Sequence, residues 1–185
     1  MRWCAPPSLV ARAARSAQAA PQRDGVARVA IVTGMTSSTP PAPHSSSADG
    51  APAWQDRETI RFLLEDCTTW AVVGLSGDPS RTAYQIAALL QSRGKRIVPI
   101  HPSAPTVLGE QGYASLADVP FPIDVVDVFR RSEAAGRFAD EAVQVGAKGV
   151  WFQLGVLDTD AFARTTAAGV AMVMDTCPAI EWRRD

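Results

Sequence analysis

A glycine-rich turn at residues 74–81, Gly-Leu-Ser-Gly-Asp-Pro-Ser-Arg, has the residue types of a phosphate-binding loop. It follows an apolar run of strand length, its glycines allow the backbone to approach an anion, and Ser76 and Ser80 can donate hydroxyl hydrogen bonds. The helix expected to begin near Thr82 would add N–H groups with a partial positive charge, and Arg81 would add a full charge. We therefore interpret the turn as a phosphate site. The alternative is a tight glycine turn with a solvated arginine.

Three further side chains have types that could do chemistry. His101 lies in a proline turn, where a lone histidine is more often a polar turn residue than a base. Asp127 lies inside an apolar run, and because a buried carboxylate needs partners we expect it to accept hydrogen bonds from backbone N–H groups. Cys177 is either a buried, inert thiol or a thiol exposed to a ligand. With no close cysteine pair and no second histidine nearby, neither a metal site nor a catalytic residue is expected.

Helical and strand-like patterns alternate from Trp54 onward. Apolar side chains recur at helical spacing in four segments, and short apolar runs of strand length lie between them. Strands that are apolar throughout and alternate with helices indicate a parallel sheet covered on both faces. The predicted fold class is α/β, a small Rossmann-like parallel sheet of about five strands. The expected helices cover residues 60–67, 83–90, 135–142 and 158–168, and the expected strands cover residues 69–75, 96–100, 124–129, 150–154 and 171–174.

The carboxyl ends of parallel strands lie at one edge of the sheet, where ligands of such folds bind. The turn at residues 74–81, His101 and Cys177 each follow a predicted strand, so we expect them at that edge. Trp151 and Phe152 lie within a strand and are expected to be core residues. Trp182, Arg183 and Arg184 are expected to form a surface tail.

Residues 1–53 differ in composition from the rest of the chain. They are rich in Ser, Pro, Ala and Arg. From Thr36 to Ala53 there is almost no large apolar side chain, so this stretch cannot bury enough surface to offset the entropy of ordering. We expect a disordered tail there and a folded domain over residues 54–185. Met35 directly precedes the Ser/Pro-rich stretch, so translation starting at Met35, with a mis-assigned start before it, is a second interpretation.

The overall composition excludes several classes of protein. The net charge of −1 provides no field that would gather nucleic acid or an anionic membrane surface. No apolar stretch approaches the roughly 20 residues that a membrane-spanning helix needs. Three widely spaced cysteines do not make a disulfide framework, so a reducing cytoplasm is the expected location.

The turn at residues 74–81 lacks the motifs of the commonest nucleotide folds. A nicotinamide site would show G-x-G-x-x-G with an acidic residue about 20 positions later. Here Ser76 stands where the second glycine would be, and the second strand ends Ile100-His101-Pro102 without an acid. The triphosphatase loop G-x-x-x-x-G-K-[ST] is also absent. These absences count against a small NAD(P)-dependent oxidoreductase, which we keep only as an alternative.

Five segments, taken in order, resemble one known family. They are the turn at residues 74–81, the His101-Pro102 turn, Val-Val-Asp-Val-Phe-Arg-Arg-Ser-Glu (125–133), Gly-Ala-Lys-Gly-Val-Trp-Phe-Gln-Leu-Gly (146–155) and Met-Asp-Thr-Cys-Pro-Ala-Ile-Glu (174–181). Over about residues 55–182 the chain resembles the stand-alone CoA-binding domain family. Those bacterial proteins are similar to the N-terminal, CoA-binding domain of the succinyl-CoA synthetase α subunit.

This resemblance implies that coenzyme A, or an acyl-CoA, lies across the carboxyl edge of the sheet. The synthetases carry their phosphohistidine in a second domain that this chain does not have, so we expect a non-catalytic ligand-binding module, with its protein partner left open. A CoA-linked thiol-redox protein that uses Cys177 is the second alternative. Related sequences often carry a lysine after the second strand, and residues 103–106 hold none. The expected binding residues are Gly74, Leu75, Ser76, Gly77, Arg81, Pro102, Phe129, Arg130, Gln153, Leu154, Gly155 and Cys177.

Overall fold

The computed structural model describes residues 50–184, which contain a five-stranded parallel sheet. The predicted α/β fold class is confirmed. The expected tail falls outside the described residues except for its last four, so the domain boundary and the role of Met35 stay predictions. The strands, which are adjacent in the order β2-β1-β3-β4-β5, are β1 (Thr69–Val73), β2 (Arg96–Ile100), β3 (Val125–Val128), β4 (Gly149–Phe152) and β5 (Ala171–Val173).

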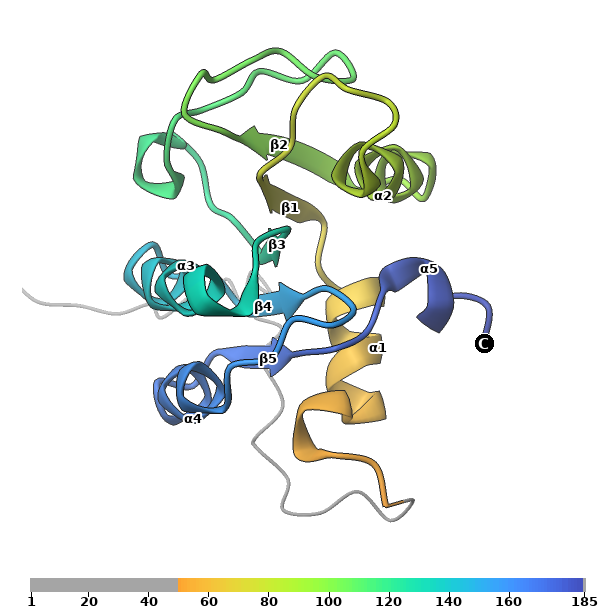
Figure 1. The fold of residues 1–185 in the computed structure, drawn as a ribbon, viewed down its shortest axis with the longest axis vertical. Coiled ribbons are helices and arrows are strands. Elements are labelled where there is room, and N and C mark those ends of the chain that lie inside the picture. The colour runs from red at the N-terminus through yellow and green to blue at the C-terminus, as the bar shows by residue number, and fades with distance from the viewer. Residues whose placement is uncertain (1–49, 185) are drawn as a thin grey trace, which may run out of the picture. The chain divides into compact units, whose positions relative to one another are not determined.

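Helices cover both faces of this sheet, as Figure 1 shows. One face is covered by α1 (Arg57–Glu65), α2 (Thr82–Ser92) and α5 (Pro178–Glu181), and the other by α3 (Ser132–Gln144) and α4 (Thr159–Ala167). Two single-turn 3-10 helices, η1 (Ala53–Gln55) and η2 (Leu116–Asp118), lie in the connections. Because helices cover both faces, β3 and β4 are buried along their whole length, which explains their lack of polar alternation.

A separate apolar core lies on each face of the sheet. The core under α1, α2 and α5 contains Trp70 and Trp151, whose ring centroids are 5.9 Å apart. The core under α3 and α4 contains Phe152 and Phe138. Trp151 and Phe152 are both fully buried and point to opposite faces, so their prediction as core residues is confirmed.

Local signals fix the ends of several helices. The side chain of Asp158 accepts a hydrogen bond from the backbone N–H of Ala161, so Asp158 is the N-cap of α4, as predicted. Gly94 and Gly146 follow α2 and α3 with φ values of +79° and +73°, a conformation that glycine adopts without strain. The first helix begins and ends earlier in the chain than expected. It ends at Glu65, so Cys67 is a buried residue of the connection to β1 rather than part of the helical stripe.

The prediction that Trp182, Arg183 and Arg184 form a surface tail is wrong for Trp182, whereas Arg183 and Arg184 are exposed. Pro178 begins the short helix α5, and Trp182 packs against the core under α1, α2 and α5. The guanidinium of Arg93 lies 5.0 Å from the centroid of the Trp182 ring. A helix of four residues is too short to show a periodic apolar stripe, so the sequence pattern could not reveal it.

The strand order indicates which edge of the sheet holds the candidate ligand site. From β1 the chain moves to β2 on one side and then returns to β3 on the other side, so the order reverses between β1 and β3. In open parallel sheets ligands bind outside the carboxyl ends of the strands at such a reversal. The carboxyl ends of β1 and β3 therefore position the candidate site.

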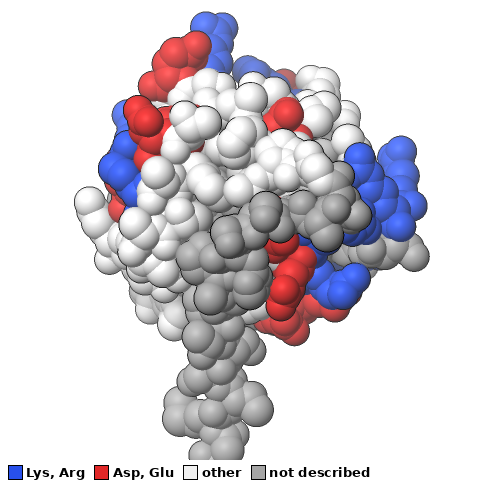
Figure 2. All heavy atoms as spheres, turned by 90° about the horizontal axis from the view of Figure 1, so that it is seen from below, with Lys and Arg blue, Asp and Glu red and all other residues white. Residues whose placement is uncertain are grey.

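The described surface includes a face without a broad patch of one charge. Figure 2 shows acidic and basic side chains in small groups around its margin, with uncharged residues across much of the rest. None of the described helices is long and apolar enough to cross a membrane.

Candidate ligand-binding site

Two adjoining cavities lie at the carboxyl edge of the sheet. The smaller, of about 300 Å³, is lined by the turn after β1 and by His101, and the larger, of about 790 Å³, by the segments after β3, β4 and β5. Thr82, Phe129 and Arg130 line both cavities. The pair therefore spans the reversal in strand order between β1 and β3, and both volumes are typical of small-molecule sites.

Gly74 brings the guanidinium of Arg130 close to the first turn. The residue has a φ of +90°, and a Cβ placed on it would lie 3.0 Å from the carbonyl oxygen of Phe129 and 3.6 Å from Nε of Arg130. A side chain at this position would be strained by the positive φ and would crowd the Phe129 carbonyl oxygen, whereas Arg130 lies at ordinary contact distance from the turn. Nε of Arg130 is buried and has no hydrogen-bond partner in the part of the chain that the structure describes. A positive charge with a free donor thus lies where an anion could approach.

Arg81 differs from Arg130 because it is held at the surface. It occupies the position before α2, its side chain is 74% exposed, and its Nε lies 3.8 Å from a carboxylate oxygen of Asp78. The same carboxylate accepts hydrogen bonds from the N–H and hydroxyl of Ser80, at 3.0 and 2.7 Å. These bonds from Ser80 lower the pKa of Asp78. The Ser80 hydroxyl, which was expected to be able to donate to a phosphate, thus donates to Asp78 in this structure.

The loop after β4 forms one wall of the larger cavity and is fixed at two points. The N–H of Gly155 donates to Oδ1 of Asp175 at 2.8 Å, and the N–H of Leu157 donates to the hydroxyl of Ser132 at 3.0 Å. Asp175 itself has a φ of 53°, which is unusual for a residue other than glycine. Leu154, directly before the first of these anchors, is 63% exposed and lines the cavity. The wall is therefore held by polar contacts and presents an apolar side chain.

Asp127 lies beneath the larger cavity, and its predicted partners are wrong. Its side chain is fully buried, and Oδ1 accepts a hydrogen bond of 2.6 Å from Nε2 of Gln153 rather than from backbone N–H groups. Oδ2 has no partner within residues 50–184. Burial raises the pKa of Asp127 to about 7, although the bond from Gln153 acts in the opposite direction. The N–H groups of strands β1 and β4 are used in the sheet, which leaves only a side chain to pair with it.

Cys177 lies at the N-terminus of α5 and lines the larger cavity. Burial raises the pKa of its thiol, and hydrogen bonds from the N–H groups of Ala179 and Ile180 oppose this only in part. The thiol is therefore mainly protonated near neutral pH. Cys67 is fully buried, and burial raises the pKa of its thiol to about 12. Of the two described cysteines, Cys177 is thus the one that a ligand in the cavity could reach.

Most of the expected binding residues line the two cavities, and three do not. Leu75 is fully buried in the core, while Gly77 and Pro102 are exposed away from both cavities. The nine that line a cavity are Gly74, Ser76, Arg81, Phe129, Arg130, Gln153, Leu154, Gly155 and Cys177. His101, expected as a turn residue, also lines the smaller cavity, and its Nδ1 lies 2.8 Å from the hydroxyl of Ser103.

Sequence reasoning missed several lining residues. Ile180 was not expected because α5 itself was not expected. Thr82, Arg131 and Val156 could have been found, since each directly follows a residue that was expected to bind. The lining residues outside the expected set are Thr82, Ala83, His101, Arg131, Ala134, Val156 and Ile180.

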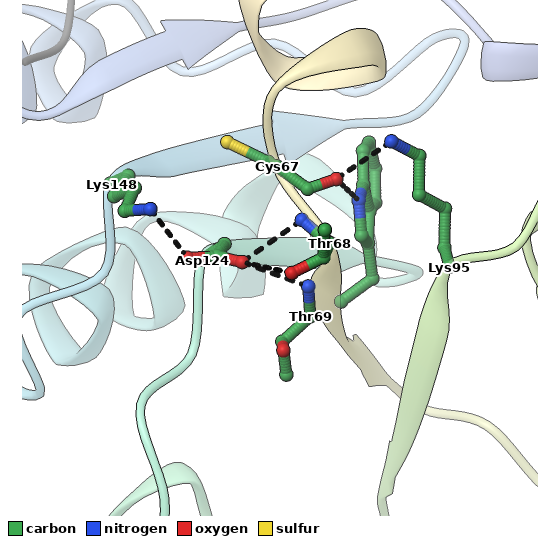
Figure 3. Close-up of polar contacts among 7 residues, drawn as sticks. Cys67, Thr68, Thr69, Lys95, Asp124 and Lys148 are labelled. Carbon is green, nitrogen blue, oxygen red and sulfur yellow. Dashed lines mark hydrogen bonds and ion pairs between the residues drawn. The ribbon is translucent and has the colours of Figure 1, made fainter. Parts of the chain in front are cut away.

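The opposite, amino edge of the sheet contains a second polar cluster, shown in Figure 3. One carboxylate oxygen of Asp124 accepts hydrogen bonds from the N–H groups of Thr68 and Thr69, both at 2.9 Å, and from the Thr68 hydroxyl at 3.0 Å. The other oxygen lies 2.9 Å from Nζ of Lys148. Burial acts to raise the pKa of Asp124, but these bonds outweigh it and leave the pKa below its usual value. Here a carboxylate joins three segments of the chain, and both of its oxygens have partners.

Comparison with known proteins assigns the fold to a family. The family model described as "CoA binding domain" matches residues 68–183. An uncharacterized Bacillus subtilis protein, YneT, is 35% identical over 118 residues, which are 64% of this chain and 87% of that protein.

Solved structures of similar proteins agree with this match. A hypothetical protein from Pyrococcus horikoshii OT3 is 31% identical with a TM-score of 0.66, and the match covers 76% of this chain and 96% of that chain. A dinucleotide-forming acetyl-coenzyme A synthetase 1 from Ca. Korarchaeum cryptofilum is 26% identical with a TM-score of 0.54, over 60% of this chain but 26% of that enzyme. Because the family model spans more than half of the sequence, the chain belongs to the CoA-binding domain family.

Proposed function

We propose that the protein binds coenzyme A, or an acyl-CoA, along the two cavities at the carboxyl edge of the sheet. The phosphates lie in the smaller cavity and the pantetheine arm in the larger one. One observation carries the proposal. The two cavities adjoin at Arg130, which lies at the reversal in strand order and has a buried Nε without a partner among the described residues. A charged donor in this position is suited to a diphosphate that passes from one cavity to the other.

The chemistry of each cavity supports this orientation. Arg81 and Arg130 both line the smaller cavity, together with the first turn of α2, and these groups are suited to bind phosphate. The larger cavity is lined mainly by apolar side chains, with Gln153 and Cys177 among them. The pantetheine arm is a mostly apolar chain with two amides and a terminal thiol, so it fits a lining of this kind.

We propose a binding module rather than a complete enzyme. In the described residues, Cys177 has neither a lowered thiol pKa nor a histidine among the residues that line its cavity. Residues 50–184 also contain no group of three His, Cys, Asp or Glu side chains placed to hold a metal ion. A cytoplasmic location and a role apart from nucleic acid belong to the same proposal, supported by the free Cys67 and Cys177 and by the net charge of −1.

One observation favours a second function, a CoA-linked thiol-redox protein. Cys177 lines the larger cavity, where the terminal thiol of a bound pantetheine arm would lie. A mixed disulfide between the two sulfurs would need an oxidised form of CoA as the reactant. The raised pKa of Cys177 slows this exchange, because the thiolate is the reacting form. We therefore rank this function second.

Native mass spectrometry of protein purified without added ligand tests the proposed function. A retained CoA, acyl-CoA or NAD would identify itself by its mass. Calorimetric titrations with CoA and with NAD then give the two affinities. The proposal predicts binding of CoA and much weaker binding of NAD. Saturable binding of NAD with no binding of CoA would overturn it and support the oxidoreductase alternative.

A further inference from the structure

The carboxyl group of Asp127 is buried beside the larger cavity without lining it. Asp127 is paired in register with Trp151 of β4, and Gln153 is two residues beyond Trp151, so Asp127 and Gln153 extend from the same face of the sheet. Gln153 is 7% exposed and lines the cavity, while Asp127 is fully buried. The two side chains therefore form a stack in which Gln153 separates the acid from the space available to a ligand.

This arrangement fixes which end of the Gln153 amide faces inward. An amide group has a donor end and an acceptor end. Nε2 of Gln153 donates to Oδ1 of Asp127 at 2.6 Å. The remaining atom, Oε1, is then free to accept a hydrogen bond at the cavity.

We propose that Asp127 is a positioning residue that holds the carbonyl oxygen of Gln153 toward the larger cavity, where it accepts a hydrogen bond from an amide N–H or the thiol of the pantetheine arm. This inference rests on the proposed binding of CoA and adds the atom that recognises its arm. Asp127 acts through Gln153 and does not touch the ligand.

The charge of Asp127 controls this orientation. An ionised carboxylate can only accept, so the Gln153 amide must give it the N–H end. A protonated carboxyl can donate to Oε1, which lets the amide turn over and present its NH₂ group to the cavity instead. Burial raises the pKa of Asp127 to about 7, so both orientations are populated near neutral pH. A ligand that offers N–H or S–H donors therefore binds more tightly when Asp127 is ionised. Below about pH 7, where Asp127 is mainly protonated in the free protein, binding of such a ligand should release the proton of Asp127.

Other ionisable groups cover the same face of the sheet and must be separated from Asp127. They are Tyr84 on α2, Cys177 before α5, and Glu181 on α5, which pairs with Arg184. The sheet-facing residues of α1, Ile60, Leu63 and Leu64, are apolar. Cys177 is coupled to Asp127, since the charge of Asp127 contributes to its raised thiol pKa. Arg81, Arg130, Arg131 and His101 line the two cavities, so a variant of His101 is needed as a control.

Calorimetry with dephospho-CoA between pH 5.5 and 8.5 tests the inference. This ligand keeps the pantetheine arm and lacks the phosphate monoester, whose own ionisation near pH 6 would disturb the profile. We expect the wild type to bind about tenfold more tightly at pH 8 than at pH 6, the size of one good hydrogen bond. Titrations in two buffers of different ionisation enthalpy should show a proton released near pH 6.

Two variants test whether the released proton comes from Asp127 and whether the effect depends on Gln153. Asp127→Asn keeps the shape and cannot ionise, so its affinity should not change with pH and no proton should be released. Gln153→Met removes the carbonyl oxygen, so it should bind weakly at every pH. Cys177→Ser and His101→Asn should keep the wild-type pH slope, whatever their effect on absolute affinity.

The outcomes separate this inference from the proposed function. If dephospho-CoA binds and the pH slope persists in Asp127→Asn or disappears in His101→Asn, Asp127 does not position Gln153. If Asp127→Asn does not fold, Gln153→Met is the test. A pH dependence of dephospho-CoA affinity that persists in Gln153→Met would also show that Asp127 does not act through Gln153. A wild type that binds neither CoA nor dephospho-CoA at any pH overturns the proposed function itself.

Discussion

Asp124 and Asp127 lie close together in the sequence and at opposite edges of the sheet, and their surroundings differ in the number of donors. Asp124, before β3, receives three hydrogen bonds and an ion pair, and its pKa lies below the usual value. Asp127, near the end of β3, receives one hydrogen bond, and burial raises its pKa to about 7. The same side chain is therefore a structural clamp at one edge and an unsatisfied acid at the other.

This difference leads us to expect that substitutions at the two edges of the sheet affect different properties of the protein, stability at one edge and ligand binding at the other. At the amino edge the chain satisfies its own polar groups, so we expect changes there to affect folding. At the carboxyl edge Asp127 and Arg130 each keep a buried atom without a partner in the described chain. Unpaired buried groups are costly, and they tend to persist where a ligand completes them. Changes at this edge should therefore affect binding more than folding.

The largest effect should follow from Asp124→Ala. It removes the acceptor of the Thr68 and Thr69 N–H groups and the partner of Lys148, and we expect a loss of roughly 3 to 4 kcal/mol in the free energy of unfolding. Urea denaturation measures this. Asp124→Asn keeps one acceptor oxygen and should lose less. A loss below about 1 kcal/mol for Asp124→Ala would show that the contacts of Asp124 contribute little to the stability of the fold.

The contribution of Asp124 should depend on pH in a defined direction. Its pKa is lowered by folding, so its stabilising effect is present above the unfolded pKa near 4 and is lost as pH falls through the folded value. The difference in stability between wild type and Asp124→Asn should therefore be largest above about pH 4 and shrink in stronger acid. A difference that stays constant down to pH 2 would show that the charge of Asp124 is not the cause.

At the carboxyl edge the largest effect on binding should follow from Arg130→Ala. A charge-assisted hydrogen bond to phosphate contributes about 1.5 to 3 kcal/mol, so CoA affinity should fall roughly 10- to 150-fold. Arg81 is 74% exposed, so Arg81→Ala should cost roughly tenfold or less. Calorimetry at moderate salt measures both. The control is Arg164→Ala on α4, because Arg164 is also exposed and pairs with Asp140 outside the two cavities. Equal CoA affinities for all three variants would contradict the proposed binding of the phosphates in the smaller cavity.

A smaller effect, of opposite sign, should follow from Asp127→Asn in the protein without ligand. The folded pKa of about 7 exceeds the unfolded value near 4, so ionising Asp127 destabilises the fold as pH rises through that window. We expect the variant to be more stable than wild type at pH 8, and the two to be similar at pH 4. Urea denaturation at both pH values measures this. A variant less stable than wild type at pH 8 would show that Asp127 has partners that the structure does not describe.

The smallest effect should be the capture of CoA disulfide by Cys177. Burial raises its thiol pKa, so the reaction should be slow, and intact-mass analysis should show one CoA adduct that dithiothreitol removes. The adduct should be absent from Cys177→Ser, since Cys67 is fully buried. An adduct that persists in Cys177→Ser, or none at all while CoA binds, would return Cys177 to a structural role.

The sequence predicted the fold well because each element has a local signal. Continuous apolar runs gave all five strands, and the Asp158 cap and Gly94 marked the ends of helices. The helix α5 has no such signal, because four residues cannot show a helical period. Its packing, and with it the position of Trp182, depends on contacts with distant segments of the chain.

The sequence indicated where the candidate site lies, but not which of its side chains form hydrogen bonds with one another. Position after a strand is enough to bring Arg130, Gln153 and Cys177 to one edge. The bond between Asp127 and Gln153 depends on the register of β3 against β4, which no local pattern contains. Likewise, the capture of the Ser80 hydroxyl by Asp78 depends on the conformation of the turn. Sequence reasoning can thus locate the candidate site, whereas the hydrogen bonds need the structure.

Hydrogen–deuterium exchange with and without CoA tests most directly whether the carboxyl edge is the binding edge. We predict slower exchange on addition of CoA in residues 74–83, 129–134, 153–157 and 176–180, which include most residues that line the two cavities. Residues 66–69 and 146–149, around the Asp124 clamp at the amino edge, should exchange at unchanged rates. CoA binding that slows exchange at the amino edge, or that leaves the segments at the carboxyl edge unprotected, would contradict the account.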